Sequence, residues 1–201
     1  MKSIYQTNFK NQKVLVRVDF NVPLNSEKIV TDNSRIIAAK KTIDKIINDG
    51  GTAILMSHLG RPKGKDPELS LIHIVKAVES VLEKPVLFTN QVIGEKTTEI
   101  VKNSKPGQIV LIENLRYYPQ EEEGNNSFAK ELSKLAESYV NDAFGTAHRA
   151  HASTSVVAEF FKGNKFAGDL LLKEVDSIKK VIEDGKKPVL AILGGAKVSS
   201  K

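Results

Sequence analysis

The chain contains no cysteine and no tryptophan, and aromatic residues make up only 6% of its 201 residues. Without cysteine there is no disulfide framework, no thiol catalysis and no cysteine-ligated metal site. No apolar run approaches the ~18 residues that a membrane-spanning helix needs, and residues 1–8 carry no apolar signal core. A hydrophobic content of 40% excludes a disordered chain and indicates a globular protein.

Arginine is also scarce, although the chain is basic, with 30 Lys and Arg, 24 Asp and Glu and a net charge of +6. This balance suggests anionic partners, either nucleic acid or small phosphorylated metabolites. Most lysines fall on solvated helix surfaces, whereas arginine suits bidentate recognition of phosphate and carboxylate. One arginine, Arg17, lies inside an apolar run, and four stand at segment ends: Arg35, Arg61, Arg116 and Arg149. Each alone would be an ordinary ion pair, but together the four predict a site for a small anion.

Short apolar runs alternate with segments of helical periodicity along the whole chain. Strands are predicted at residues 13–18, 52–56, 86–88, 108–112, 139–140 and 188–193. Helices are predicted from an N-cap at Ser34 to Gly50, and over residues 71–82, 95–101, 128–135, 154–161 and 171–182. This alternation predicts an α/β fold, a doubly wound, Rossmann-like parallel sheet with helices on both faces.

The pattern also suggests how the chain is divided. Residues 163–165 interrupt it, so we expect an amino-terminal domain over residues 1–167 and a connecting helix over residues 168–186. A strand and a Gly194-Gly195 turn then follow, and a strand at that place needs neighbours to satisfy its backbone. We therefore expect residues 187–201 to be the truncated start of a second, similar domain.

Polar residues follow four of the predicted strands. In a parallel sheet the carboxyl ends of the strands meet at one edge, where ligands bind in such folds. The four groups are 19–23 (DFNVP), 57–65 (SHLGRPKGK), 113–116 (ENLR) and 141–151 (NDAFGTAHRAH). They offer guanidinium groups, imidazole, amide and carboxylate, a set that suits an anion that also carries hydroxyl groups.

The sequence lacks the common motifs for binding phosphate or metal. The sequence has no G-x-G-x-x-G fingerprint and no Walker A sequence. His148 and His151 have the spacing of a possible metal-ligand pair, but the chain has only four histidines and no cysteine, so no structural metal site is predicted.

The chain resembles the phosphoglycerate kinase family. The resemblance is carried, in the family's order, by residues 17–23 (RVDFNVP), 32–35 (DNSR), 57–62 (SHLGRP), 113–116 (ENLR), 141–149 (NDAFGTAHR) and 193–199 (LGGAKVS). It implies two doubly wound domains joined by a hinge, the first binding 3-phosphoglycerate and the second binding ATP or ADP with Mg²⁺. Residues 168–172 (GDLLL) depart from the family's usual Gly-Phe-Leu-Met, and Ser200 stands where Asp is common.

The resemblance also implies site residues. Those around 3-phosphoglycerate would be Asp19, Phe20, Asn21, Arg35, His58, Leu59, Gly60, Arg61, Arg116 and Arg149. Lys197 would meet the transferring phosphoryl group, Lys201 the nucleotide phosphates, and Arg35 and Lys197 would be catalytic. The ligand of Mg²⁺ would lie beyond Lys201.

The implied reaction moves a phosphoryl group between 1,3-bisphosphoglycerate and ADP, giving 3-phosphoglycerate and ATP. We expect this chain alone to be inactive, and the full-length protein to be a cytoplasmic monomer without nucleic-acid or membrane partners. Two alternatives remain. A nucleic-acid-binding module is disfavoured because basic residues are interleaved with acidic ones and no RNA- or DNA-binding signature is present. A non-catalytic relic that only folds or associates is disfavoured by the intact cluster of site residues.

Overall fold

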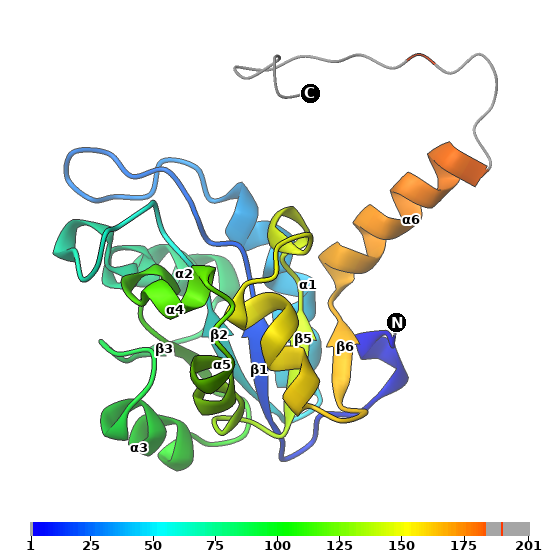
Figure 1. The fold of residues 1–201 in the computed structure, drawn as a ribbon, viewed down its shortest axis with the longest axis horizontal. Coiled ribbons are helices and arrows are strands. Elements are labelled where there is room, and N and C mark those ends of the chain that lie inside the picture. Colours follow the sequence, from blue (N-terminus) through cyan, green and yellow to red (C-terminus); the bar gives the residue numbers. More distant parts are fainter. Residues whose placement is uncertain (1, 184–189, 191–201) are drawn as a thin grey trace.

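The structure is a computed structural model that describes residues 2–183 and 190 (Figure 1). Its strands are β1 (Lys13–Arg17), β2 (Thr52–Met56), β3 (Val86–Phe88), β4 (Ile109–Leu111), β5 (Ser138–Asn141) and β6 (Lys165–Ala167). Its α-helices are α1 (Ser34–Asn48), α2 (Val75–Leu82), α3 (Glu95–Asn103), α4 (Pro119–Glu122), α5 (Asn126–Ser133) and α6 (Asp169–Glu183). Short 3-10 helices cover Ile4–Gln6, Pro67–Leu69, Leu71–Ile74, Leu115–Tyr117, Phe144–Thr146 and Val157–Phe160, and Ala152–Val156 is a π-helical turn.

The six described strands form one parallel sheet in the order β3-β4-β2-β1-β5-β6. Two parallel neighbours flank β1, with Arg17 in register with Met56 of β2 and with Asn141 of β5. The carboxyl ends of these three central strands are therefore level, and the residues that follow them start from adjacent points of one sheet edge.

Two hydrophobic clusters cover the two faces of the sheet. The first packs α1 and α2 against β1 and β2, with Ile43, Ile46 and Leu55 fully buried. The second packs α3, α5 and the turn at residues 152–160 against the other face, around Leu15, Ile54 and Leu132. The predicted fold class, a parallel sheet with helices on both faces, is confirmed for the described residues. None of the helices in these residues is long and apolar enough to cross a membrane.

Three local features differ from the predictions. The helix predicted over residues 154–161 is present as a π-helical turn followed by a 3-10 helix and not as a regular α-helix, and the Tyr139 hydroxyl hydrogen is shared between the Ser153 and Thr154 carbonyls. Ser34 is the first helical residue and not the N-cap, and its N–H donates to Asp32 Oδ1 at 2.8 Å. The interruption predicted at residues 163–165 holds for Gly163 and Asn164, but Lys165 begins the edge strand β6, whose pairing with β5 a three-residue run does not reveal.

Helix α6 begins inside the domain and runs away from it (Figure 1). Asp169 and Leu171 are buried, whereas Ile178, Val181 and Ile182 are exposed. The role of this helix as a connection between two domains remains a prediction, as do the domain limits. The strand and turn predicted after residue 187 lie outside the described residues, apart from Leu190.

Candidate functional site

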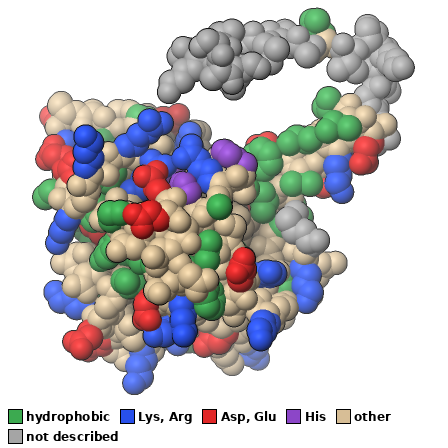
Figure 2. Space-filling model, viewed as in Figure 1, with side chains coloured by type: hydrophobic (Ala, Val, Ile, Leu, Met, Phe, Trp, Pro, Cys, Tyr) green, Lys and Arg blue, Asp and Glu red, His purple; other side chains and the backbone are tan. Residues whose placement is uncertain are grey.

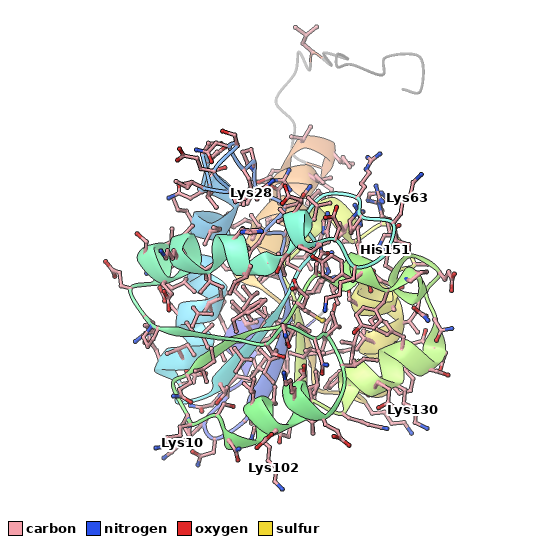
Figure 3. The ribbon with its side chains drawn as sticks, turned by 90° about the vertical axis from the view of Figure 1, so that its left-hand side faces the viewer. Lys10, Lys28, Lys63, Lys102, Lys130 and His151 are labelled. Carbon is pink, nitrogen blue, oxygen red and sulfur yellow. The ribbon has the colours of Figure 1, made fainter. Side chains whose placement is uncertain are left out.

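The polar segments after β1, β2, β4 and β5 lie at one end of the domain. Figure 3 shows His151, Lys28 and Lys63 toward this end, and Lys10 and Lys102 at the opposite one. Figure 2 shows Lys, Arg and His side chains gathered near the base of α6, with acidic side chains among them. The sheet therefore brings segments that are far apart in sequence to a common basic surface.

The segment after β1 forms one side of this surface. The Asp19 carboxylate forms an ion pair with the Arg35 guanidinium at the start of α1. Asn21 Oδ1 accepts the Gly60 N–H at 2.8 Å, which ties this segment to the one after β2. Phe20 is fully buried, and its N–H donates to Ser57 Oγ at 2.9 Å, so its side chain serves the core. Asp19, Arg35 and Asn21 thus keep polar groups at the surface.

His58 lies beneath this surface and is 5% exposed. Its Nδ1 lies 3.2 Å from Nη2 of Arg17. Burial lowers the pKa of His58 to about 2, with further lowering from the positive charges of Arg17, Arg116 and Arg35. The imidazole is therefore neutral in the folded protein at physiological pH.

The other predicted arginines differ in how they are held. Arg116 Nη1 donates to the Gly60 carbonyl at 2.7 Å, and Nε lies 3.3 Å from Glu122 Oε1. Burial lowers the pKa of Arg116, and the charges of Arg149, Arg17 and Arg61 add to this effect. Arg61 and Arg149 are exposed. The structure therefore brings Arg61, Arg116 and Arg149 into one positive field, with two of them open to solvent.

The loop 59–61 is held from behind by residues for which the sequence suggested no separate role. Asn114 is fully buried and donates to the Leu59 and Leu69 carbonyls, both at 2.8 Å. Glu113 Oε1 accepts the N–H groups of Leu71 and Asn114 at 2.8 and 2.7 Å. Gly60 has φ +61°, and a Cβ there would lie 2.8 Å from the Leu69 side chain. The sequence analysis placed Glu113 and Asn114 in the polar group after the strand at residues 108–112, but their role in holding this loop depends on contacts that the sequence does not show.

Asp142 follows β5 and faces the start of α6. Its Oδ1 accepts the N–H groups of Leu170 and Leu171 at 2.9 and 3.2 Å. Burial raises the pKa of Asp142 to about 7, against the lowering effect of these hydrogen bonds. A cleft of about 230 Å³ lies here, and its lining includes Asp19, Arg35 and Asp142. Asp142 therefore joins the edge of the basic surface to the first turn of α6.

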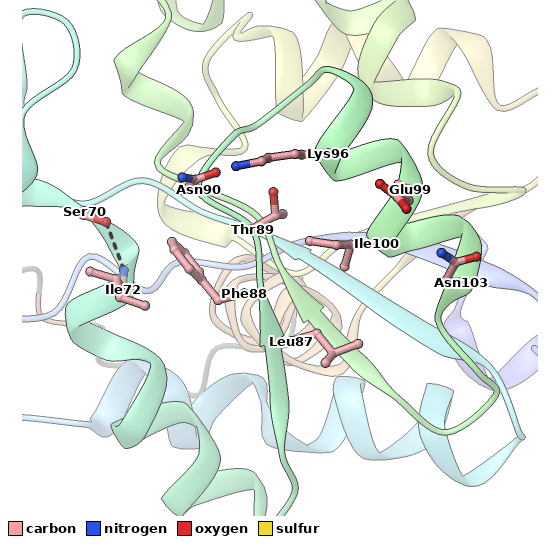
Figure 4. Close-up of a pocket in the computed structure, with 10 residues that line it drawn as sticks. All are labelled: Ser70, Ile72, Leu87, Phe88, Thr89, Asn90, Lys96, Glu99, Ile100 and Asn103. Atoms are coloured by element: carbon pink, nitrogen blue, oxygen red, sulfur yellow. Dashed lines mark hydrogen bonds between the residues drawn. The ribbon is translucent and has the colours of Figure 1, made fainter.

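Another hollow lies away from this surface. It measures about 900 Å³, lies beside β3 and α3, and is lined by Leu87, Phe88, Lys96 and Ile100 among others (Figure 4). It shares no residue with the predicted site. Since it has a mainly apolar lining, with Lys96 beside Glu99, it offers no concentration of positive charge for an anion.

Among residues 2–183 and 190, no group of His, Asp and Glu has the arrangement of a metal site. Lys197 and Lys201, the predicted nucleotide contacts, lie outside the described residues. What the described surface offers is three exposed guanidinium groups, a neutral imidazole and the polar groups of Asp19 and Asn21. This combination fits a small ligand with anionic groups and hydroxyl groups.

Comparison with known proteins shows which family the chain is similar to. The family model described as phosphoglycerate kinase matches residues 4–201. The phosphoglycerate kinase of Gloeobacter violaceus is 48% identical over 201 residues, which are 100% of this chain and 49% of the relative. That of Moorella thermoacetica is 50% identical over 192 residues, covering 95% of this chain and 48% of the relative.

Solved structures of phosphoglycerate kinases also match nearly the whole of this chain and about half of their own. The structure of phosphoglycerate kinase from Coxiella burnetii matches 98% of this chain and 49% of its own, with a TM-score of 0.85 and 37% identity. The phosphoglycerate kinase from Pyrococcus horikoshii gives a TM-score of 0.89 at 29% identity, over 99% of this chain and 50% of its own. The chain therefore spans about half the length of the relatives it matches.

Proposed function

The chain belongs to the phosphoglycerate kinase family, and from this premise we propose that it is the 3-phosphoglycerate-binding half of an ATP:3-phosphoglycerate phosphotransferase. The observation that carries the proposal is the positive surface at the carboxyl end of the sheet, formed by Arg35, Arg61, Arg116 and Arg149 around neutral His58. Several guanidinium groups at one place match a ligand with both a phosphate and a carboxylate.

The reaction transfers a phosphoryl group between the acyl phosphate of 1,3-bisphosphoglycerate and ADP. When ATP is the phosphoryl donor, the acceptor is the carboxylate of 3-phosphoglycerate. This carboxylate is ionised at neutral pH, so no general base is needed. Catalysis then depends on positioning and on neutralising charge as the phosphoryl group moves. Arg35 is the described residue proposed for the second task.

Asp19 and Arg35 have linked roles in this proposal. Arg35 is half exposed and is paired with Asp19. An anionic substrate would compete with the Asp19 carboxylate for the guanidinium. Asp19 would then accept from a substrate hydroxyl group, while Asn21 keeps Gly60 in place. The site would also be shaped by the backbone of the two loops that contain Phe20, Leu59 and Gly60.

Nucleotide binding belongs to the part of the enzyme for which this chain supplies only Lys197 and Lys201. We propose that Mg²⁺ with ATP or ADP binds there, and that closure of the two halves excludes water from the acyl phosphate. On this proposal the 201-residue chain binds 3-phosphoglycerate but does not turn it over. The cytoplasmic location and the monomeric state of the full-length protein are parts of the same proposal.

Calorimetric titration of the chain with 3-phosphoglycerate tests the proposal. We expect saturable binding, and an increase of Kd by at least about tenfold in Arg149→Ala, because a hydrogen bond to a charged group is worth ~1.5–3 kcal/mol. Lys130→Ala is the matched control, since Lys130 is exposed and lies away from the segments that form the site (Figure 3). A folded chain without binding, or equal losses in both variants, would contradict the proposal.

A parallel titration separates the nucleic-acid alternative. A DNA-binding protein loses affinity steeply with salt, because binding releases counterions from the phosphates. We expect no DNA or RNA binding at 0.2 M salt, a salt concentration at which 3-phosphoglycerate still binds.

A further inference from the structure

A buried row of polar side chains leads from α4 to Arg17, the residue whose Nη2 lies 3.2 Å from Nδ1 of His58. It consists of Glu121 at the end of α4, Ser153 in the π-helical turn and Arg17 at the end of β1. All three are at most 1% exposed. Buried polar groups of this kind lower the stability of the fold unless each has a hydrogen-bond partner.

The direction of each hydrogen bond follows from the chemistry of its partners. Ser153 donates twice to the Glu121 carboxylate, from its N–H at 2.9 Å and from its hydroxyl at 2.5 Å. The Ser153 hydroxyl oxygen then accepts from Arg17 Nε at 2.9 Å. Arg17 Nη1 donates to the Val18 carbonyl. These bonds fix the guanidinium plane through a carboxylate that belongs to another element.

The last donor of Arg17 meets His58. Nη2 of Arg17 lies 3.2 Å from Nδ1 of His58, and a guanidinium has donors but no acceptor. Nδ1 must therefore be the accepting nitrogen, without a proton. The ring is then neutral and carries its proton on Nε2, the one donor left to it.

The charges around the ring act in the same direction. Besides Arg17 on β1, the cationic groups that influence His58 are Arg35 on α1 and Arg116 after β4, with His151 as a further titratable neighbour. Each of these positive charges disfavours the doubly protonated, charged form of the ring. Burial of His58 adds to this, so the imidazolium form is opposed both by the hydrogen bond and by the surrounding charge.

We propose that Arg17, held by Ser153 and Glu121, is a positioning residue that fixes His58 as the neutral Nε2–H tautomer and so makes the ring a hydrogen-bond donor to the bound anion. The inference rests on the proposed function, because the anion is taken to be 3-phosphoglycerate. On this view His58 contributes an oriented N–H to a substrate oxygen. No proton is transferred, and the positive charge of the site comes from the arginines.

Nitrogen NMR of the histidine rings in the 201-residue chain tests the tautomer without any ligand. We expect His58, assigned by loss of its signals in His58→Gln, to remain the neutral Nε2–H tautomer from pH 8 to pH 5. A ring that is protonated on Nδ1, or that becomes charged within this range, would overturn the proposal.

Two variants test whether the buried row sets the tautomer. Ser153→Ala removes the acceptor of Arg17 Nε. Glu121→Gln replaces one of the two carboxylate oxygens that accept from Ser153 with an NH2 group, which cannot accept. In both we expect a mixture of His58 tautomers and an increase of at least about threefold in the Kd of 3-phosphoglycerate. Ser104→Ala is the control, because Ser104 is also a buried serine but its hydroxyl donates to the Val101 carbonyl in α3.

The outcomes separate the two proposals. A purely structural role for the row would lower the stability of Ser153→Ala and Ser104→Ala alike and leave His58 unchanged, which would overturn the inference. If 3-phosphoglycerate binds the unaltered chain while His58 carries its proton on Nδ1, the inference fails and the proposed function stands. If the tautomer is as expected but the folded chain does not bind 3-phosphoglycerate, the proposed function fails, and the substrate role of His58 fails with it.

Discussion

Asn114 satisfies both backbone hydrogen-bonding groups of Leu59. Its Oδ1 accepts the Leu59 N–H at 3.3 Å, and its Nδ2 donates to the Leu59 carbonyl at 2.8 Å. One buried amide thus does for the loop after β2 what a neighbouring strand does within the sheet. The loop leads directly to Gly60 and Arg61, so the position of these two residues depends on Asn114.

Replacing Asn114 by Ala should lower both stability and ligand affinity. The Leu59 groups and the Leu69 carbonyl would lose a partner within a buried region, and each unsatisfied group costs ~1–3 kcal/mol. We expect a loss of about 2–4 kcal/mol in the free energy of unfolding, measured with urea. Asn164→Ala, which removes an exposed 3.5 Å contact to the Glu137 carbonyl, should change it by less than about 0.5 kcal/mol. Similar losses in both would contradict this role.

His58 should make the protein less stable in acid. Its pKa is lowered to about 2 in the folded state, mainly by burial, whereas an unfolded histidine takes up a proton below pH ~6.5. Between these values the unfolded state binds more protons, so stability falls as pH falls, by at most about 1.4 kcal/mol per pH unit. In His58→Gln the slope of the unfolding free energy between pH 6.5 and 4 should be smaller. An unchanged slope would mean that the ring is charged in the folded protein.

Asp142 should act with the opposite sign. Burial raises its pKa to about 7, whereas an unfolded aspartate loses its proton near pH ~3.9. The folded state binds the extra proton between these values, so this residue's contribution to stability is present at low pH and is lost as pH rises toward 7. Asp142→Asn keeps an acceptor for Leu170 and Leu171 but cannot ionise. It should remove this loss and be more stable relative to the original chain at pH 8 than at pH 4.5. A relative stability independent of pH would contradict the assignment.

Gly168 should not tolerate a side chain. An added Cβ would lie 2.2 Å from Asp142 Oδ1, in the short connection between β6 and α6. Gly168→Ala must displace either Asp142 or the first turn of α6, and we expect a loss of about 1–3 kcal/mol. Gly145→Ala is the matched control, since its Cβ would have an ordinary 3.7 Å contact with Asp19 Oδ2. Thermal unfolding of the two variants should separate them clearly, and equal transition temperatures would contradict the packing described here.

The sequence by itself determined the fold class and most of the elements. A pattern that repeats over several helical turns, such as the apolar stripe from Ile36 to Ile47, can be recognised without knowledge of its packing partners. A short run of apolar residues such as 52–56 likewise indicates a buried strand. The positions of the candidate site were also predictable, because parallel strands place the residues that follow them at one edge. The resemblance to a known family then supplied roles for those residues.

Only the tertiary structure decided how the site residues are held. Strand β6 and the π-helical turn at residues 152–156 depend on contacts with β5, which no local pattern encodes. Nothing in the sequence relates Glu121 to Ser153, or Ser153 to Arg17, since hydrogen bonds between distant segments exist only after the chain has packed. The protonation state of His58 follows from that packing, because burial and neighbouring charge, rather than residue type, set the pKa of an ionisable group.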